Sequence, residues 1–164
     1  MGKLLLCVAQ LSLTTVIAFA QSTSTAVENF GLVGTWANDC GRHAGPDNEY
    51  STFFVFSDGR VGLRHDFGPD YGNMTYRIVD AKRIGLYRLS LRQVPVTDKE
   101  IVLDVTMLKS GNRLRVWSSR GSDGNVYVED GIVSSADGRE TGWAVRCPGQ
   151  WTNDGIITRI TFER

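Results

Sequence analysis

The chain has 164 residues, with 18 Lys and Arg against 18 Asp and Glu, so its formal net charge is zero. This balance argues against a nucleic-acid-binding protein, because neutralising phosphates requires a basic face. It gives no support either for a basic helix that lies on a membrane surface. The length that remains after a short leader suits one domain with its own hydrophobic core.

Residues 1–20 have the pattern of a secretory signal peptide. Lys3 gives a positive start, an apolar run follows, and Ala18-Phe19-Ala20 is the small-x-small pattern that signal peptidase accepts. The alternative is a membrane anchor, but polar residues dilute the run and no basic stop-transfer cluster follows it. We therefore expect cleavage after Ala20, a periplasmic or extracellular protein, and no membrane association after cleavage.

Two cysteines remain after the predicted cleavage, Cys40 and Cys147. In an oxidising compartment such a pair predicts a disulfide. The alternatives are two free thiols or a metal site. No C-x-x-C is present, so the zinc and thioredoxin-like patterns are missing, and we expect no metal and no cofactor.

Residues 21–30 are small and polar, which predicts a flexible leader without a packing role. Residues 31–164 alternate apolar and polar side chains between Asp-Gly turns, and no stretch keeps a helical period over three turns. The predicted strands are 33–37, 50–57, 60–66, 73–80, 84–92, 100–109, 112–119, 125–133, 141–147 and 156–163.

The predicted strands have one apolar face each, and short turns join them. Such sheets hide that face by closing on themselves or by packing on a second sheet. Because the connections look like a run of hairpins, we expect an all-β domain, a single antiparallel meander that closes into a β-barrel of about 8–10 strands.

The hairpin around Asp58-Gly59 predicts which residues face the barrel interior. A two-residue loop there pairs Phe54 with Leu63 and places both on the core face together with His65. Asp66 then points away, so His65 and Asp66 cannot form a catalytic pair. His65 is either a hydrogen-bonded residue at the edge of the core or part of a binding site at the barrel mouth.

The stretch Gly31–Asp39 resembles the G-x-W opening of the lipocalin-like proteins, the calycins, with Gly34 and Trp36 at the matching positions. The resemblance implies a first strand whose Trp covers one end of the barrel and an Arg from the last strand that packs across it, Arg159 or Arg164. The layout also resembles small, uncharacterised exported bacterial proteins with an early Trp and a W-x-x-x-C near the end, here Trp143 and Cys147.

The sequence contains no H-E-x-x-H, G-x-S-x-G, P-loop or G-x-G-x-x-G motif, and only two His, so we predict no catalytic residues and rank an enzyme third. The first hypothesis is a binding protein for a small apolar ligand. The alternative is a protein-binding module, such as an inhibitor of a secreted or host enzyme. The inward apolar residues are numerous enough to fill a small barrel, which argues against a ligand cavity. The candidate ligand-binding residues at the barrel mouth are His65, Arg42, His43, Tyr71, Phe54 and Leu63.

A second candidate surface is the polar face of residues 113–120, which mixes arginines with an aromatic. Arg and Trp are common anchors of protein interfaces, so this face suits the protein-binding alternative. The simpler interpretation is a charge-rich outer strand with one Trp packed under its side chains. The residues are Arg113, Arg115, Trp117 and Arg120.

Overall fold

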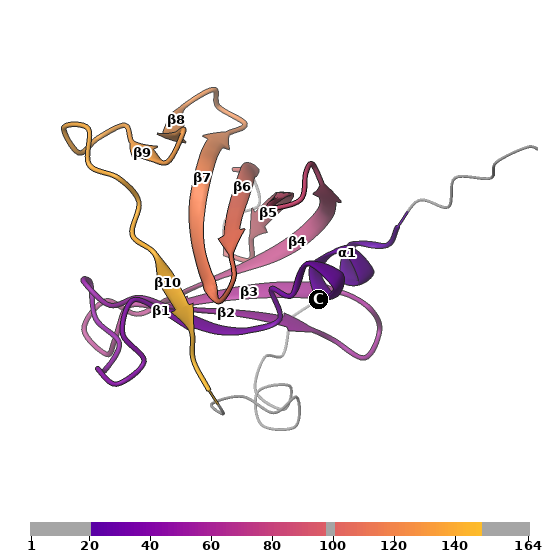
Figure 1. Ribbon diagram of the computed structural model, residues 1–164, viewed down its shortest axis with the longest axis horizontal. Coiled ribbons are helices and arrows are strands. Elements are labelled where there is room, and N and C mark those ends of the chain that lie inside the picture. Colours follow the sequence, from indigo (N-terminus) through magenta and orange to yellow (C-terminus); the bar gives the residue numbers. More distant parts are fainter. Residues whose placement is uncertain (1–20, 98–100, 149–164) are drawn as a thin grey trace, which may run out of the picture.

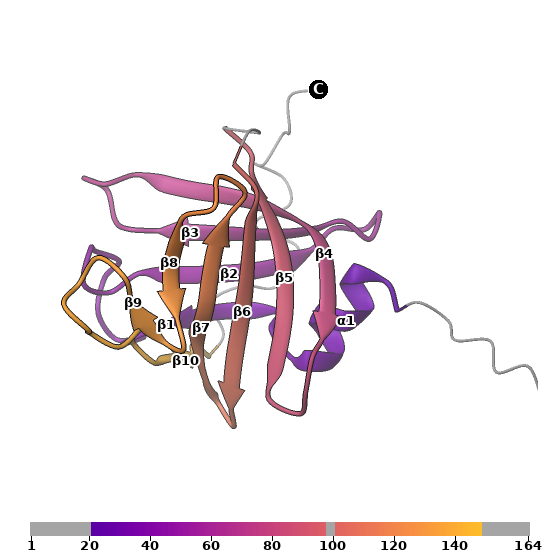
Figure 2. The same ribbon diagram turned by 90° about the horizontal axis from the view of Figure 1, so that it is seen from above.

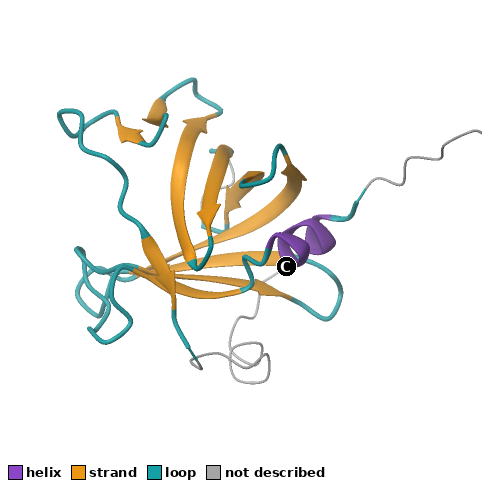
Figure 3. Cartoon of the chain, in the orientation of Figure 1, coloured by secondary structure: helices purple, strands orange, loops and turns teal. Residues whose placement is uncertain are grey.

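The computed structural model describes residues 21–97 and 101–148. These residues form one short helix and an antiparallel sheet of 10 strands (Figures 1 and 3). Within the described ranges, no helix combines the length and apolar character needed to cross a bilayer. The elements are α1 (Thr23–Phe30), β1 (Gly34–Ala37), β2 (Tyr50–Val55), β3 (Val61–Asp66), β4 (Asn73–Arg83), β5 (Arg88–Pro95), β6 (Leu103–Ser110), β7 (Arg113–Gly121), β8 (Val126–Glu129), β9 (Ile132–Val133) and β10 (Ala144–Arg146).

The sheet closes into a barrel through β10, which pairs with β1 on one side and with the start of β7 on the other. Eight strands, β1–β7 and β10, form the barrel wall, while β8 and β9 continue from the far end of β7. The prediction of an all-β antiparallel meander that closes into a barrel is therefore confirmed. The predicted strand 156–163 and the candidate arginines Arg159 and Arg164 lie outside the described residues.

The segment predicted as a flexible leader folds as α1, so that prediction was wrong. The Ser22 side chain caps the helix by accepting a hydrogen bond of 3.2 Å from the Thr25 backbone N–H. Gly31 ends it with a φ of 74°, a conformation that favours glycine. Val27 and Phe30 are buried beside β4 and belong to the barrel core. The helix therefore covers one end of the barrel (Figure 2).

The β2–β3 hairpin has a three-residue loop in place of the predicted two-residue loop. The Phe56 N–H donates to the Arg60 carbonyl over 2.8 Å, and Gly59 has a φ of 82° within the turn. The extra residue shifts the register by one, so Phe53 lies opposite Leu63, whereas Phe54 lies opposite Gly62. Phe54 therefore lies on the outer face, and its ring occupies the space that a side chain at Gly62 would need. Its predicted inward position was wrong.

The N-terminal part of β1 is fixed to β10, the strand that closes the barrel. The indole N–H of Trp36 donates to the Leu32 carbonyl over 2.7 Å, and the side chain is 1% exposed. Arg146 lies opposite Trp36 in the β1–β10 pairing and donates to the Val33 carbonyl over 2.7 Å. Gly34 leaves room for this arginine, because a Cβ there would come within 3.2 Å of the Arg146 Nε.

A disulfide joins Cys40, just after β1, to Cys147, just after β10, with their Cα atoms 5.4 Å apart. The predicted bond is therefore confirmed. The two cysteines are 107 residues apart in the sequence. Because β1 and β10 are neighbouring strands, the bond reinforces the seam at which the barrel closes.

Candidate ligand-binding site

The barrel interior contains a half-open cavity of about 720 Å³ that opens to solvent at one end. This volume lies in the range of small-molecule sites in proteins. Its mouth lies between the β1–β2 loop, around Pro46 and Asp47, and the segment around Arg139 and Glu140. Figure 2 shows this loop and β9 at the opposite end of the barrel from α1. The cavity is therefore closed at the helix end and open at the other end.

The inward apolar side chains gather at the closed end and leave the other half of the barrel open. Val27, Phe30, Leu32, Leu89 and Leu91 are buried together there. The cavity floor and wall are formed by further apolar residues of the same core, which include Trp36, Phe53, Leu63, Val105, Met107, Leu114 and Val116. The number of inward apolar residues, given above as an argument against a ligand cavity, therefore does not exclude one.

A cluster of three polar side chains lies inside the cavity at the ends of β2 and β3. Ser51 lies opposite His65 in the β2–β3 pairing, and Glu49 immediately precedes β2. The Ser51 hydroxyl donates to Glu49 Oε1 over 2.5 Å and lies 3.0 Å from His65 Nδ1. His65 Nδ1 also contacts Glu49 Oε1. One carboxylate oxygen therefore holds both the serine and the histidine.

The β1–β2 loop holds Glu49 in this position through the preceding residue. Asn48 is fully buried, and its side-chain carbonyl accepts a hydrogen bond of 2.9 Å from the Asp39 N–H. Its amide group donates to the carbonyls of Asp39 and His43 over 3.0 and 3.1 Å. These bonds fix the loop from inside, so Glu49 enters β2 with a defined orientation.

The electrostatics favour an ionised carboxylate in this cluster. Burial opposes ionisation of Glu49, but the hydrogen bond and charge of His65 and the Ser51 hydroxyl outweigh burial and lower the pKa of Glu49. Burial, with the charges of Glu49 and Tyr127, raises the pKa of Tyr76, whose side chain lies edge-on to the His65 ring. Nδ1–H therefore donates to Glu49, and Nε2 makes no hydrogen bond within the described residues.

The cluster differs from the serine–histidine–acid arrangement of hydrolases. In such a triad the serine and the acid contact opposite nitrogens of the imidazole. Here Ser51 and Glu49 both contact His65 Nδ1. In the described part of the chain, no serine hydroxyl donates a hydrogen bond to His65 Nε2. The geometry therefore orients an imidazole without activating a nucleophile. The arrangement suits binding through hydrogen bonds.

The predicted ligand-binding residues fall in three places. His65 and Leu63 line the cavity, His65 in the inward orientation predicted for it. Arg42 and His43 lie with Phe54 around a separate outer pocket. Tyr71, in the β3–β4 loop, is 69% exposed and lines neither space. Asp66 points outward as predicted and borders the outer pocket.

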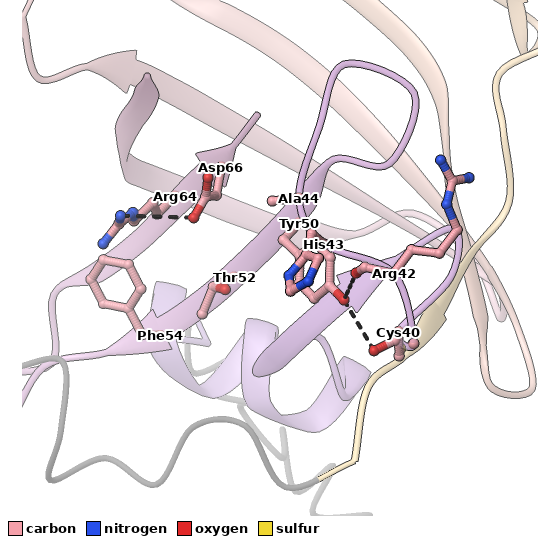
Figure 4. Close-up of a pocket in the computed structure, with 10 residues that line it drawn as sticks. Cys40, Arg42, His43, Ala44, Tyr50, Thr52, Phe54, Arg64 and Asp66 are labelled. Carbon is pink, nitrogen blue, oxygen red and sulfur yellow. Dashed lines mark hydrogen bonds and ion pairs between the residues drawn. The ribbon is translucent and has the colours of Figure 1, made fainter. Parts of the chain in front are cut away.

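The outer pocket, of about 320 Å³, lies between the β1–β2 loop and the outer faces of β2 and β3 (Figure 4). The Tyr50 hydroxyl donates to the Arg42 carbonyl over 2.7 Å, and Arg64 lies 4.0 Å from Asp66. Arg42 itself pairs with Asp47 over 2.7 Å. The polar groups of the outer pocket therefore largely contact one another. The outer pocket also has less than half the volume of the interior cavity.

Three of the four residues predicted on the outer face, Arg113, Arg115 and Trp117, form an interleaved stack with Arg88 and Trp143. The Arg88 guanidinium lies 4.4 Å from the centre of the Trp117 ring. Arg115 lies between Trp117 and Trp143, at 5.3 and 4.9 Å, and Arg113 lies 4.8 Å from Trp143. Each tryptophan is half-buried between two guanidinium groups. The stack therefore joins β5 and β7 to the segment before β10, which favours the structural interpretation of this face.

Sequence reasoning missed the polar side chains that distinguish the cavity from an apolar core. Glu49 stands in a loop, where no periodicity indicates its direction. Tyr76 shares a face of β4 with Ile78, but alternation does not reveal what its hydroxyl contacts. Gln93 had a detectable signal, because it follows Leu89 and Leu91 in the inward row of β5. No group of His, Cys, Asp and Glu in the described residues is arranged to hold a metal ion.

No match was found among protein-family models, among curated proteins or among solved structures. The site is therefore interpreted from its own geometry.

Proposed function

We propose that the protein is an exported, lipocalin-like binding protein that holds a small, largely apolar molecule inside its barrel. The observation that carries this proposal is the open cavity of about 720 Å³, which has apolar side chains on its floor and polar groups near its mouth. A pocket of this size and composition suits a ligand that is enclosed on most of its surface.

The arrangement of β1 supports the lipocalin-like part of the proposal. The G-x-W glycine and tryptophan, Gly34 and Trp36, lie at the closed end of a barrel, and an arginine from the closing strand occupies the space beside the glycine. That arginine is Arg146. Export is supported by the signal-like N-terminus and by the disulfide, because such bonds persist in oxidising compartments.

The binding proposal is tested by closing the cavity without disturbing the rest of the barrel. Ser119 on β7 lines the cavity, whereas its neighbour Ser118 pairs with Thr106 and points to the other face. Ser119→Trp places a large ring in the cavity, and Ser118→Trp is the matched control. Native mass spectrometry of the protein exported by a bacterial host, with naphthalene titrations followed by tryptophan fluorescence, gives the readout.

We expect the wild type and Ser118→Trp to retain or take up an apolar molecule, and Ser119→Trp to lose at least tenfold in affinity. Equal uptake by all three proteins would place binding outside the cavity. If none of them binds, the ligand proposal fails and a protein partner becomes the working hypothesis. The intact mass of the exported protein tests the export part, since cleavage after Ala20 leaves Gln21 as the first residue, two residues before α1.

A further inference from the structure

Three polar residues on neighbouring strands of the cavity wall have side-chain atoms without a hydrogen-bond partner among the described residues. Tyr76 is 7% exposed and Gln93 is 4% exposed, and both line the cavity. Within the described residues, neither the Tyr76 hydroxyl nor the Gln93 amide makes a hydrogen bond, and His65 Nε2 makes none either. We call these three residues, His65, Tyr76 and Gln93, the polar belt.

These groups border a cavity that opens to solvent, so a ligand that fills the cavity removes them from water. Removing an amide or a hydroxyl from water without a new hydrogen bond costs on the order of 1–3 kcal/mol in proteins. Because His65, Tyr76 and Gln93 all border the cavity, whatever occupies the cavity can supply the missing bonds. The polar belt is therefore an inward-facing recognition surface.

The polar belt runs along one side of the cavity. His65 lies on β3, and Leu63, two residues before it, pairs with Tyr76 on β4. Gln93 on β5 pairs with Ile78, two residues beyond Tyr76. The wall formed by β6, β7 and β8 contributes Val105, Val116 and Val128, together with the polar side chains of Ser119 and Tyr127. A ligand that matches this cavity has a largely apolar body and a polar group that faces the polar belt.

The hydrogen-bonding roles of the polar belt select the polar group of the ligand. Glu49 and Ser51 hold His65 through Nδ1, so Nε2 is left without a partner in the described residues, and the Tyr76 hydroxyl and the Gln93 amide can each donate and accept a hydrogen bond. A hydroxyl group serves both roles at once. A carboxylate only accepts hydrogen bonds, and it would lie near the ionised Glu49. Of the arginines that line the cavity, Arg115 is stacked between Trp117 and Trp143 and pairs with Glu140 through Nη1 over 2.9 Å, while its buried Nε has no partner among the described residues.

We infer that the cavity binds an uncharged apolar molecule that carries a hydroxyl group, and that this hydroxyl contacts the polar belt. The inference rests on the proposed binding function and adds the chemical class of the ligand.

The test uses three probes with the same ring system: naphthalene, 2-naphthol and 2-naphthoate. Their affinities for the full exported protein at pH 7 are measured by tryptophan fluorescence and isothermal titration calorimetry. We expect 2-naphthol to bind at least about tenfold more tightly than naphthalene, since two or more hydrogen bonds of ordinary strength supply that factor. The affinity for 2-naphthoate should be at least about tenfold below that for 2-naphthol.

Two conservative variants assign the preference to the polar belt. Tyr76→Phe and Gln93→Leu remove hydrogen-bonding atoms and keep most of the volume. Each should reduce the preference for 2-naphthol over naphthalene to threefold or less, with the naphthalene affinity unchanged as evidence that the cavity is intact. Ser90→Ala, on the same strand as Gln93 but on its outer face, should keep the full preference.

The outcomes separate this inference from the proposed function. If the wild type binds naphthalene and 2-naphthol equally, or prefers 2-naphthoate, the inference is overturned while the binding function stands. If the preference for 2-naphthol survives in both Tyr76→Phe and Gln93→Leu, the polar belt does not recognise the hydroxyl and the inference is again overturned. If no probe binds to the wild type, the proposed function fails and the inference fails with it.

Discussion

Replacing Gly34 tests whether the contact between β1 and Arg146 holds the barrel closed. Gly34 has a φ of 124°, and a Cβ there would meet Arg146 Nε at 3.2 Å and Nη2 at 3.3 Å. In Gly34→Ala the positive φ costs about 1–2 kcal/mol. Displacing the guanidinium from the Val33 carbonyl costs about 1–2 kcal/mol more, near the lower end of the values for bonds to charged groups.

We therefore expect Gly34→Ala to lower the free energy of unfolding by about 2–4 kcal/mol, measured by urea denaturation. Two control variants separate the contributions. Gly124→Ala has a φ of 87° but no atom near the new Cβ, so it should lose only the backbone part. Gly85→Ala has neither problem and should change stability by less than about 0.5 kcal/mol. Equal stabilities of Gly34→Ala and Gly85→Ala would refute the reasoning.

Four further variants test other parts of the structure. Cys40→Ala should cost about 4–5 kcal/mol, because the bond closes a loop of 107 residues, and a loss below 1 kcal/mol in urea denaturation would contradict this. Val27→Asp, at a fully buried position in α1, should cost more than about 3 kcal/mol, whereas a loose leader would tolerate it. Trp143→Ala should cost about 1–2 kcal/mol, because two guanidinium groups lose their stacking partner, and an unchanged melting temperature would contradict this. Glu49→Gln should remove stability that the wild type has above pH 5, because the pKa of Glu49 is lowered in the folded state from about 4.5. Its difference from the wild type should vanish as the pH falls through that lowered value, and a constant difference between pH 6 and pH 3 would contradict the pairing with His65.

Alternation along single strands was a sound guide to which residues face the interior. Leu89 and Leu91 on β5, and Val105 and Met107 on β6, alternate with polar residues in the sequence and are buried in the barrel core. His65 also points inward as predicted, although the loop length from which its face was derived was wrong. The face of a residue in β3 follows from alternation within β3 alone. The face predicted for Phe54 depended on the predicted loop length. Four consecutive large apolar residues, Phe53 to Phe56, fit either register.

The helix and the cavity were beyond the reach of the same reasoning. Residues 21–30 are mostly polar, and their apolar face is too short to indicate a helix from the sequence. The helix α1 gains its stability from packing on the barrel. The cavity depends on where bulky residues gather along the barrel axis, which total apolar content does not reveal. The cluster of Glu49, Ser51 and His65 combines a loop residue with two strands, so only the folded chain brings it together.

The double pairing of β10 has a consequence for how the protein is made. This strand of three residues, Ala144–Arg146, lies near the end of the described chain, yet it completes the barrel by contacting β1 and β7. A chain that emerges N-terminus first therefore exposes the unpaired edge of β1 until residue 146 has appeared. Ring closure joins segments more than a hundred residues apart, which is a slow step for an unfolded chain. Oxidation of Cys40 and Cys147 after that step would convert a late and reversible closure into a permanent one.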